Sequence, residues 1–302
     1  MKDYLTPDTG TDTPAPETDT AKPSALDMLG NSAIQGALFG GGGGGDSGGS
    51  GFSWTGAGIG AGLGTLLGGP LGGLIGGGLG GVVGGMLGGS SQRSNLDVAT
   101  DKKTGIADMP DQISLPDSVD KGMNDAWAGS LPGGNSQEQG GMIVRDKSGN
   151  IAFKKGNAGD SGSFDPDYSA VGPDETLVGV GHTHPYGKND GKLDGATGVP
   201  FSGQDLSRLC LVDDRMALVQ SGDSRFAATR SKEFDDMLAG KTMEQRQQMK
   251  GDMDKLWQDT FDGSKGTFQE RCDAAVRAVA GQYKLGYYTG KGKDLNRVDT
   301  SK

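Results

Sequence analysis

Alternating and continuous apolar runs between residues 131 and 230 predict strands separated by turns, together with one helix. Clusters of glycine, proline and polar residues mark the ends of these runs. The predicted elements are a hairpin over 142–153 with a Lys-Ser-Gly-Asn turn, a buried strand over 176–184, a helix over 202–210, and strands over 215–220 and 225–230. Further helices are predicted over 231–239, 242–261 and 266–284. This mixture predicts an α+β domain of about 100 residues with a helical extension.

Residues 1–90 follow a different pattern. Residues 1–22 are rich in Thr, Asp, Pro and Glu, and we expect them to be disordered because they bury too little apolar surface to offset chain entropy. Residues 23–39 have the spacing of a short amphipathic helix, which a run of glycines at 40–45 would end. Residues 1–52 are therefore predicted to be a disordered, low-complexity region.

Glycine dominates residues 53–90, where it recurs at every fourth position from Gly56 to Gly88 with apolar residues between. In a helix this spacing places the glycines nearly on one face, so two helices can approach closely. The segment resembles the glycine-zipper membrane segments of bacterial proteins, and Pro70 suggests a two-helix hairpin. We expect membrane interaction or self-association. A flexible tract is the alternative, since arms of roughly 15 residues, about 22 Å, are shorter than the ~30 Å hydrocarbon core.

Composition limits how much of the chain can form a packed core. Glycine accounts for 58 of the 302 residues and the apolar fraction is 33%, whereas ordinary domains are about half apolar. One modest domain with low-complexity material fits these numbers better than a single large domain. The predicted order is a low-complexity region at 1–52, the glycine zipper at 53–90, a linker at 91–130, a globular domain at 131–230 and a helical extension at 231–302.

Charge and cysteine content exclude several classes of function. The net charge of −10 argues against a nucleic-acid partner, because a duplex-binding surface must be basic. The amino terminus has no apolar h-region, so no Sec signal is predicted. Cys210 and Cys272 form no CxxC pair, so no thiolate zinc site is expected. Cys210 lies in Leu-Cys-Leu and is predicted to be buried, with a disulfide to Cys272 as an alternative.

The chain contains only two histidines, His182 and His184, at the end of the predicted buried strand. Residues two apart on a strand point to the same face, so both imidazoles can reach one metal ion while Thr183 points away. A catalytic zinc needs a third ligand and an open position, and Asp205 is the candidate. Ser202 and Asp205 also have the spacing of a helix capping box, which is compatible with a ligand because a helix start is rigid.

The sequence His182-Thr-His-Pro followed by Ser202-Gly-Gln-Asp resembles the JAMM motif of the JAB/MPN metallopeptidases, over about residues 131–230. The resemblance implies an α+β, JAB/MPN-like (cytidine deaminase-like) mixed sheet flanked by helices. It implies that His182, His184 and Asp205 bind Zn²⁺. It also implies that a glutamate acts through the metal-bound water, and that Ser202 helps to stabilise the tetrahedral intermediate.

The family glutamate precedes a strand, and Glu138-Gln-Gly-Gly-Met-Ile-Val matches that context. The resemblance therefore assigns the base role to Glu138, with a loop carboxylate as the alternative interpretation. Glu175 is the rival acid. It lies about seven residues before His182, or roughly 23 Å along an extended strand, which is too far for the same metal. We expect Glu175 to be a solvated residue at the start of the strand.

The segment between His184 and Ser202 is longer than the family spacing and rich in glycine and aspartate. We expect an inserted flexible loop that either gates the substrate or is a tolerated surface insertion. Asp190 and Asp194 are predicted to be solvated rather than metal ligands.

These features predict a zinc metallopeptidase or amidase that hydrolyses peptide or isopeptide bonds. The resemblance implies two substrate classes, the peptides of peptidoglycan and protein tails. The order of segments resembles bacterial secreted toxins. We therefore expect a membrane-associated antibacterial effector that is secreted without a Sec signal, for example by a type VI apparatus, acts in a bacterial target cell and has a cognate immunity protein. The alternatives are a membrane-disrupting or scaffold protein whose activity lies in the glycine zipper, and a phage tail-associated cell-wall hydrolase.

Overall fold

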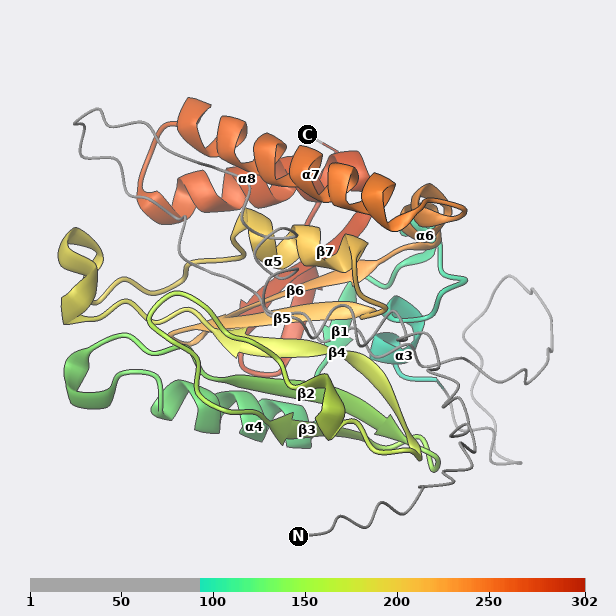
Figure 1. The fold of residues 1–302 in the computed structure, drawn as a ribbon, viewed down its shortest axis with the longest axis horizontal. Helices are drawn as coiled ribbons and strands as arrows, with labels where there is room; N and C mark the ends of the chain where they lie inside the picture. Colours follow the sequence, from blue (N-terminus) through green and yellow to red (C-terminus); the bar gives the residue numbers. More distant parts are fainter. Residues whose placement is uncertain (1–92, 302) are drawn as a thin grey trace, which may run out of the picture.

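The computed structural model describes residues 93–301, which fold around one curled mixed sheet (Figure 1). In this part of the chain eight strands are hydrogen-bonded in the order β1-β8-β7-β6-β5-β4-β2-β3. Their bounds are β1 Gln112–Ser114, β2 Gly140–Asp146, β3 Ile151–Lys155, β4 Glu175–Thr183, β5 Met216–Ser221, β6 Ser224–Arg230, β7 Leu285–Lys291 and β8 Asp294–Arg297. Neighbouring strands are antiparallel except β4 and β5, which are parallel.

Helices cover both faces of the sheet and make the fold α+β. The α-helices are α3 Asn95–Ala99, α4 Asp117–Ala128, α5 Gly203–Ser207, α6 Lys232–Leu238, α7 Met243–Gly263 and α8 Phe268–Tyr283. Short 3-10 helices lie in the connecting segments: η1 Ile106–Asp108, η2 Pro132–Gly134, η3 Tyr168–Ala170, η4 Lys188–Leu193 and η5 Arg208–Cys210. Figure 1 shows α5, α7 and α8 on one side of the sheet and α4 on the other.

The larger core lies between the sheet and helices α5 to α8. Ala217 and Val219 of β5 belong to this core, together with Tyr287 of β7. Helix α7 begins at a capping box formed by Thr242 and Gln245. Its buried side chains recur every four residues, which produces one apolar stripe along the helix. They are Met249, Met253, Trp257 and Phe261.

The opposite face of the sheet forms a second core against α3 and α4. Met216 and Leu218 point into it, alternating with the β5 residues of the first core. Helix α4 contributes Val119 and Met123, and β1 contributes Ile113. The sheet is therefore buried on both faces where β4 and β5 run side by side, and this rigid pair carries the candidate site.

Most predicted elements between residues 140 and 284 are confirmed. The hairpin over 142–153 corresponds to β2 and β3, and the buried strand over 176–184 corresponds to β4. The remaining matches are β5, β6, α5 with η5, α6, α7 and α8.

The prediction of a linker over 91–130 is wrong for residues 93–130. These residues supply α3, β1 and α4, and β1 pairs with β8 at the edge of the sheet. Helix α4 is hard to recognise in the sequence, because only Val119, Met123 and Ala126 are buried among charged and polar residues. Their spacing of four and three is helical, yet polar residues fill the rest of the segment.

The extension after residue 230 is not wholly helical. Helix α8 ends at Lys284, whose left-handed backbone (φ 57°) turns the chain into β7. β7 pairs with β6, and β8 pairs with β7, so both strands lie within the sheet. The predicted boundary between 131–230 and 231–302 therefore does not divide the fold.

The predictions for 1–52 and 53–90, including the glycine-zipper hairpin, lie outside the described residues. Within residues 93–301, no helix combines the length and the apolar character needed to cross a bilayer. Cys210 and Cys272 are free thiols buried in the first core, so Cys210 is buried as predicted and the alternative of a disulfide is wrong.

Candidate metal centre

β4 delivers both histidines to the face of the sheet that packs against α5. His182 pairs with Val219 of β5 and with Gly140 of β2. His184 follows the last residue of the strand, and its backbone N–H donates to the carbonyl of Gln220 at 2.9 Å. Both histidines are buried, with 7% and 6% of their surface exposed. The predicted strand therefore holds the two imidazoles on one side, between two neighbouring strands.

Gly140 lets β2 approach the first histidine closely. A Cβ atom at this position would lie 2.5 Å from the carbonyl oxygen of Gly181 and 2.9 Å from Cβ of His182. Any larger residue would push the strand or the imidazole away. Glycine at 140 is thus a steric requirement of the site.

Asp205 comes from the first turn of α5, on the same side of the sheet. Ser202 caps this helix: its hydroxyl and its backbone N–H each donate to Oδ2 of Asp205 at 2.7 Å, and the Asp205 N–H donates to the hydroxyl at 3.3 Å. The capping box predicted for these two residues is confirmed. The start of α5 is itself fixed, because the Trp257 indole N–H of α7 donates to the carbonyl of Phe201 at 3.2 Å.

The three side chains converge on one point. The Nε2 atoms of His182 and His184 lie 3.1 Å apart. They lie 3.1 and 3.3 Å from the two carboxylate oxygens of Asp205. Ligand atoms bound tetrahedrally at about 2.0–2.1 Å are roughly 3.3 Å from one another. These three residues could therefore hold a metal ion, and the convergence predicted from the sequence is confirmed.

A second hydrogen bond sets the tautomer of His184. Its Nδ1 atom lies 2.9 Å from the carbonyl oxygen of Pro200, an acceptor, so Nδ1 carries the hydrogen. In the neutral imidazole the lone pair of Nε2 is then directed towards His182 and Asp205. Ligating histidines generally have such a partner on the other ring nitrogen.

The electrostatics of the site favour a positive charge between the ligands. Burial alone would lower the pKa of His184, but hydrogen bonding to Asp205 and the charges of Asp205 and Glu138 raise it to about 9. Burial lowers the pKa of His182, although Asp205 opposes this. Burial would raise the pKa of Asp205, yet the two imidazoles hold it well below its usual range. In the absence of a metal the site therefore retains a proton on one histidine, which a cation would displace.

Glu138 lies two residues before β2 and is buried, with 7% of its surface exposed. Burial raises its pKa to about 8, with Asp205 adding to the shift and His184 opposing it. None of the residues between 93 and 301 donates a hydrogen bond to its carboxyl. The charges of His184 and Asp205 act on this carboxyl, so Glu138 shares the electrostatic environment of the candidate ligands.

The segment that carries Glu138 is anchored by Thr183. As predicted, Thr183 points away from the two histidines, and its hydroxyl contacts Ser130 at 2.7 Å. The Gln139 N–H donates to this hydroxyl at 3.0 Å, and the Thr183 N–H donates to the Gln139 carbonyl at 2.9 Å. The strand residue between the histidines thus fixes the backbone next to Glu138.

Glu175 lies outside the site. It begins β4 and forms an ion pair with Lys154 of β3. Its carboxylate also accepts the N–H of Gly172 at 2.7 Å. Since its side chain is 20% exposed and bound in these contacts, it is a paired residue at the start of the strand rather than a solvated one.

The inserted loop after His184 is docked against the segment before Glu138. Asp190 accepts the hydroxyl hydrogen of Ser136 and the N–H of Gly187, and Asn189 accepts the N–H of Ser136. Asp190 is therefore half-buried and hydrogen-bonded rather than solvated, while Asp194 is exposed. Neither belongs to the metal-ligand cluster, in agreement with the prediction.

Sequence analysis missed two neighbours of the site. Phe164 stacks on His182, with ring centroids 6.3 Å apart and planes 8° from parallel. Arg208 is buried three residues beyond Asp205, a spacing that places both on one face of a helix. That spacing was visible in the sequence, whereas the contact of Phe164 depends on a long loop.

The chain matches no protein-family model, no curated protein and no solved structure.

Proposed function

We propose that this chain is a zinc-dependent peptidase or amidase of the JAB/MPN type. One observation carries the proposal: two imidazoles and one carboxylate converge at tetrahedral ligand spacing. The buried Glu138 carboxyl is coupled electrostatically to His184 and Asp205. Two nitrogens and one oxygen suit Zn²⁺, and three protein ligands leave a position for water, as in catalytic zinc sites. The mixed α+β sheet is compatible with a JAB/MPN fold, and the motif residues carry the family assignment.

Each residue of the site would have its own role in the reaction. His182, His184 and Asp205 would hold the zinc, which when bound polarises a carbonyl and lowers the pKa of water. Glu138 would accept a proton from the attacking water and pass it to the leaving amine. The raised pKa of Glu138 suits a group that must both take up and release a proton near neutral pH.

Ser202 would donate a hydrogen bond to the oxyanion that develops on the substrate. Its hydroxyl donates to Oδ2 of Asp205 in the structure. If this hydroxyl turned towards the substrate, Asp205 would still accept a hydrogen bond from the backbone N–H of Ser202. The carboxylate would therefore keep its orientation during the reaction.

The substrate we propose is a peptide or isopeptide bond, with the peptides of peptidoglycan ahead of protein tails. This would fit an antibacterial effector released without a Sec signal, delivered by an apparatus such as type VI secretion and countered by an immunity protein. The glycine pattern of 53–90 would then help the chain reach a membrane.

Hydrolysis by the zinc-loaded full-length chain tests the proposal. Purified sacculi and a mixed peptide library would be incubated with wild type and with Glu138→Gln, and fragments would be identified by mass spectrometry. We expect new amine ends from wild type, and a loss of at least about 100-fold in Glu138→Gln with zinc content unchanged. Asp194→Asn, an exposed change outside the cluster, serves as the control. Turnover that survives in Glu138→Gln, or wild type that cleaves neither substrate, would contradict the proposal.

A further inference from the structure

Arg208 lies beside the metal centre but is no part of the ligand set. It is the third residue after Asp205, and the chain continues from α5 directly into η5 at this point. Side chains three apart on a helix are neighbours on one face. The guanidinium therefore follows the metal-binding carboxylate along the same face of the helix.

Two contacts hold this guanidinium in place. Its Nη1 atom donates to the hydroxyl of Tyr168 and lies 3.0 Å from Oδ2 of Asp214. The Tyr168 hydroxyl in turn donates to Asp214 Oδ2 at 3.3 Å. The Asp214 side chain has no exposed surface, so this support is rigid and dry.

The other side of the guanidinium has no hydrogen-bond partner among residues 93–301, and the Asp165 carboxylate interacts with Arg208 only electrostatically. Nε and Nη2 of Arg208 donate to none of these residues, and neither is among the fully buried atoms that lack a hydrogen bond. Both nitrogens therefore keep some contact with solvent. The only fully buried orphan in this cluster is Oδ1 of Asp214. A planar pair of N–H groups that is held on one side and lacks a hydrogen-bond partner on the other has the geometry to bind a carboxylate with two parallel hydrogen bonds.

The loop that supports Arg208 also lines the metal centre. Phe164 stacks on His182, and four residues later Tyr168 contacts Arg208. Arg208 is thus connected to the site twice, through the helix that carries Asp205 and through the loop whose Phe164 stacks on His182.

We infer that Arg208 binds a carboxylate of the substrate next to the scissile bond, so that the enzyme prefers peptides with a free carboxylate there. This inference rests on the proposed function, because it names the substrate class of the same site. The carboxylate can come from two sources, the C-terminus of the chain or an acidic side chain. Both present the same two oxygens to the guanidinium.

The direct test observes Arg208 itself by NMR. The ¹⁵N signal of its Nε–H group would be assigned by its loss in Arg208→Lys, with Arg277→Lys on α8 as the matched control. Zinc-saturated full-length protein would be titrated separately with N-acetylglycine and N-acetylglycinamide. The comparison of the two tests whether Arg208 binds a C-terminal carboxylate. The α-amides of N-acetylglutamate and N-acetylglutamine would test a side-chain carboxylate.

We expect the Arg208 signal to shift with at least one free acid and with neither amide. The acid that causes the shift identifies whether Arg208 binds a C-terminal or a side-chain carboxylate. An unchanged signal with both acids, or equal shifts with acids and amides, would overturn the inference. This readout requires no turnover, so a failure of hydrolysis would count against the proposed function alone.

Kinetics provide the second test. Wild type should cleave peptides with the free carboxylate about 10- to 100-fold faster, in kcat/KM, than their amidated counterparts, the effect expected of hydrogen bonds to a charged group. In Arg208→Lys the ratio of kcat/KM for free acids to that for amidated peptides should fall towards one, through a rise in KM for the free acids, whereas Arg277→Lys should keep the wild-type ratio. If the variant does not fold, the wild-type comparison still decides, because equal cleavage of acids and amides contradicts the inference.

Discussion

Glu138 is a buried carboxyl that accepts no hydrogen bond from the described residues. Its pKa of about 8 arises mainly from burial, with the negative charges of Asp205 and Asp160 adding to it. A group whose pKa is raised on folding stabilises the folded state most below its unfolded pKa and loses that contribution as pH rises through its folded pKa. Because of this residue, the unfolding free energy of the metal-free protein should therefore decrease between about pH 4.5 and 8.

The first prediction compares wild type with Glu138→Gln, both free of metal. The glutamine cannot ionise, so the variant escapes the cost of burying a charge. Below pH 4.5 we expect the difference in unfolding free energy between wild type and variant to stay constant. As the pH rises to 8 and above, wild type should lose up to about 5 kcal/mol of unfolding free energy relative to the variant. Urea unfolding at several pH values with a chelator present measures this. Parallel profiles across the whole range would show that the carboxyl is solvated.

The sequence predicted the ligands at the residue scale because their signals are local. His182 and His184 share a face by strand alternation, and Ser202 with Asp205 has helix-capping spacing. The motif resemblance selected Glu138 over Glu175. Its burial and raised pKa, by contrast, depend on segments that only the fold brings together.

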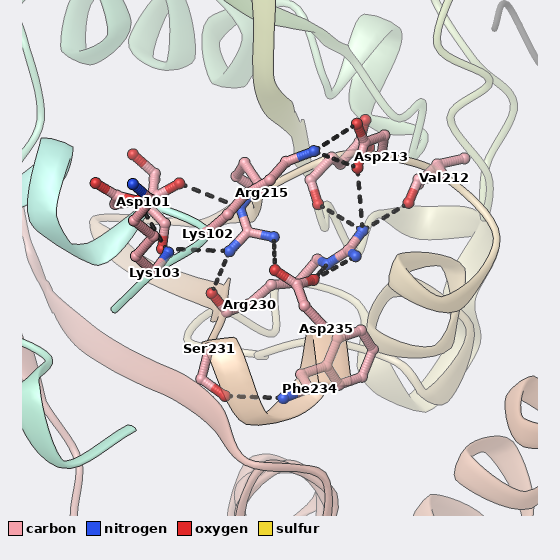
Figure 2. Close-up of polar contacts among 12 residues, drawn as sticks. Asp101, Lys102, Lys103, Val212, Asp213, Arg215, Arg230, Ser231, Phe234 and Asp235 are labelled. Carbon is pink, nitrogen blue, oxygen red and sulfur yellow. Dashed lines mark hydrogen bonds and ion pairs between the residues drawn. The ribbon is translucent and has the colours of Figure 1, made fainter. Parts of the chain in front are cut away.

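At the scale of elements, two buried arginines join the strands to the helix that follows them (Figure 2). Arg230 donates through Nε to Oδ1 of Asp235 at 2.8 Å, and Arg215 donates through Nη1 to the other oxygen at 2.5 Å. Arg215 Nη2 also donates to the carbonyl of Arg230 at 2.8 Å, and Arg230 Nη1 donates to that of Val212 at 2.8 Å. The Asp235 carboxylate in the first turn of α6 thus contacts both buried arginines, and the exposed Asp213 lies 3.8 Å from Arg230 as a second, more distant partner.

The second prediction removes that charge with Asp235→Asn. Breaking a buried ion pair on one side leaves an uncompensated charge, which costs about 3–5 kcal/mol of unfolding free energy. Asp236→Asn is the matched control, since its pair with Lys232 is exposed and screened by solvent, so its loss should change stability little. Chemical denaturation of both variants measures the difference. Equal stabilities of the two variants would refute the assigned role of this cluster.

Elements were predictable where one periodicity dominated the sequence, as in α7 with its apolar residue at every fourth position. Helix α4 was missed because three buried side chains stand among charged ones. β8 offers one buried residue, Leu295, in Asp-Leu-Asn-Arg, so its strand character comes from pairing with β7 and β1. Pairing between distant segments leaves little trace in a single sequence.

On the scale of the whole molecule, the fold extends well beyond the domain expected at 131–230. Residues 93–130 fill one face of the sheet, and β7 and β8 extend it from the other end of the chain. The candidate metal ligands come from β4, from the residue that follows it and from α5. The site therefore depends on segments that precede and follow the motif.

The third prediction follows from this extent. A chain of residues 93–302 should unfold cooperatively, while one of residues 131–302 should not, because it lacks the buried side chains of α3, β1 and α4. Circular dichroism during thermal and urea unfolding measures the cooperativity of both. A cooperative transition of the shorter chain with zinc bound would mean that residues 93–130 are dispensable.

The claim on which all the rest depends is that His182, His184 and Asp205 share one metal ion. The measurement is zinc stoichiometry and affinity of the full-length chain, by elemental analysis and calorimetry, for wild type, His184→Ala, Asp205→Ala and the exposed control Asp194→Asn. We predict a single zinc ion per chain for wild type and control, and at least about 100-fold weaker binding in the two ligand variants. Wild type that binds no zinc at saturating supply, or ligand variants that bind it as tightly as wild type, would contradict the account.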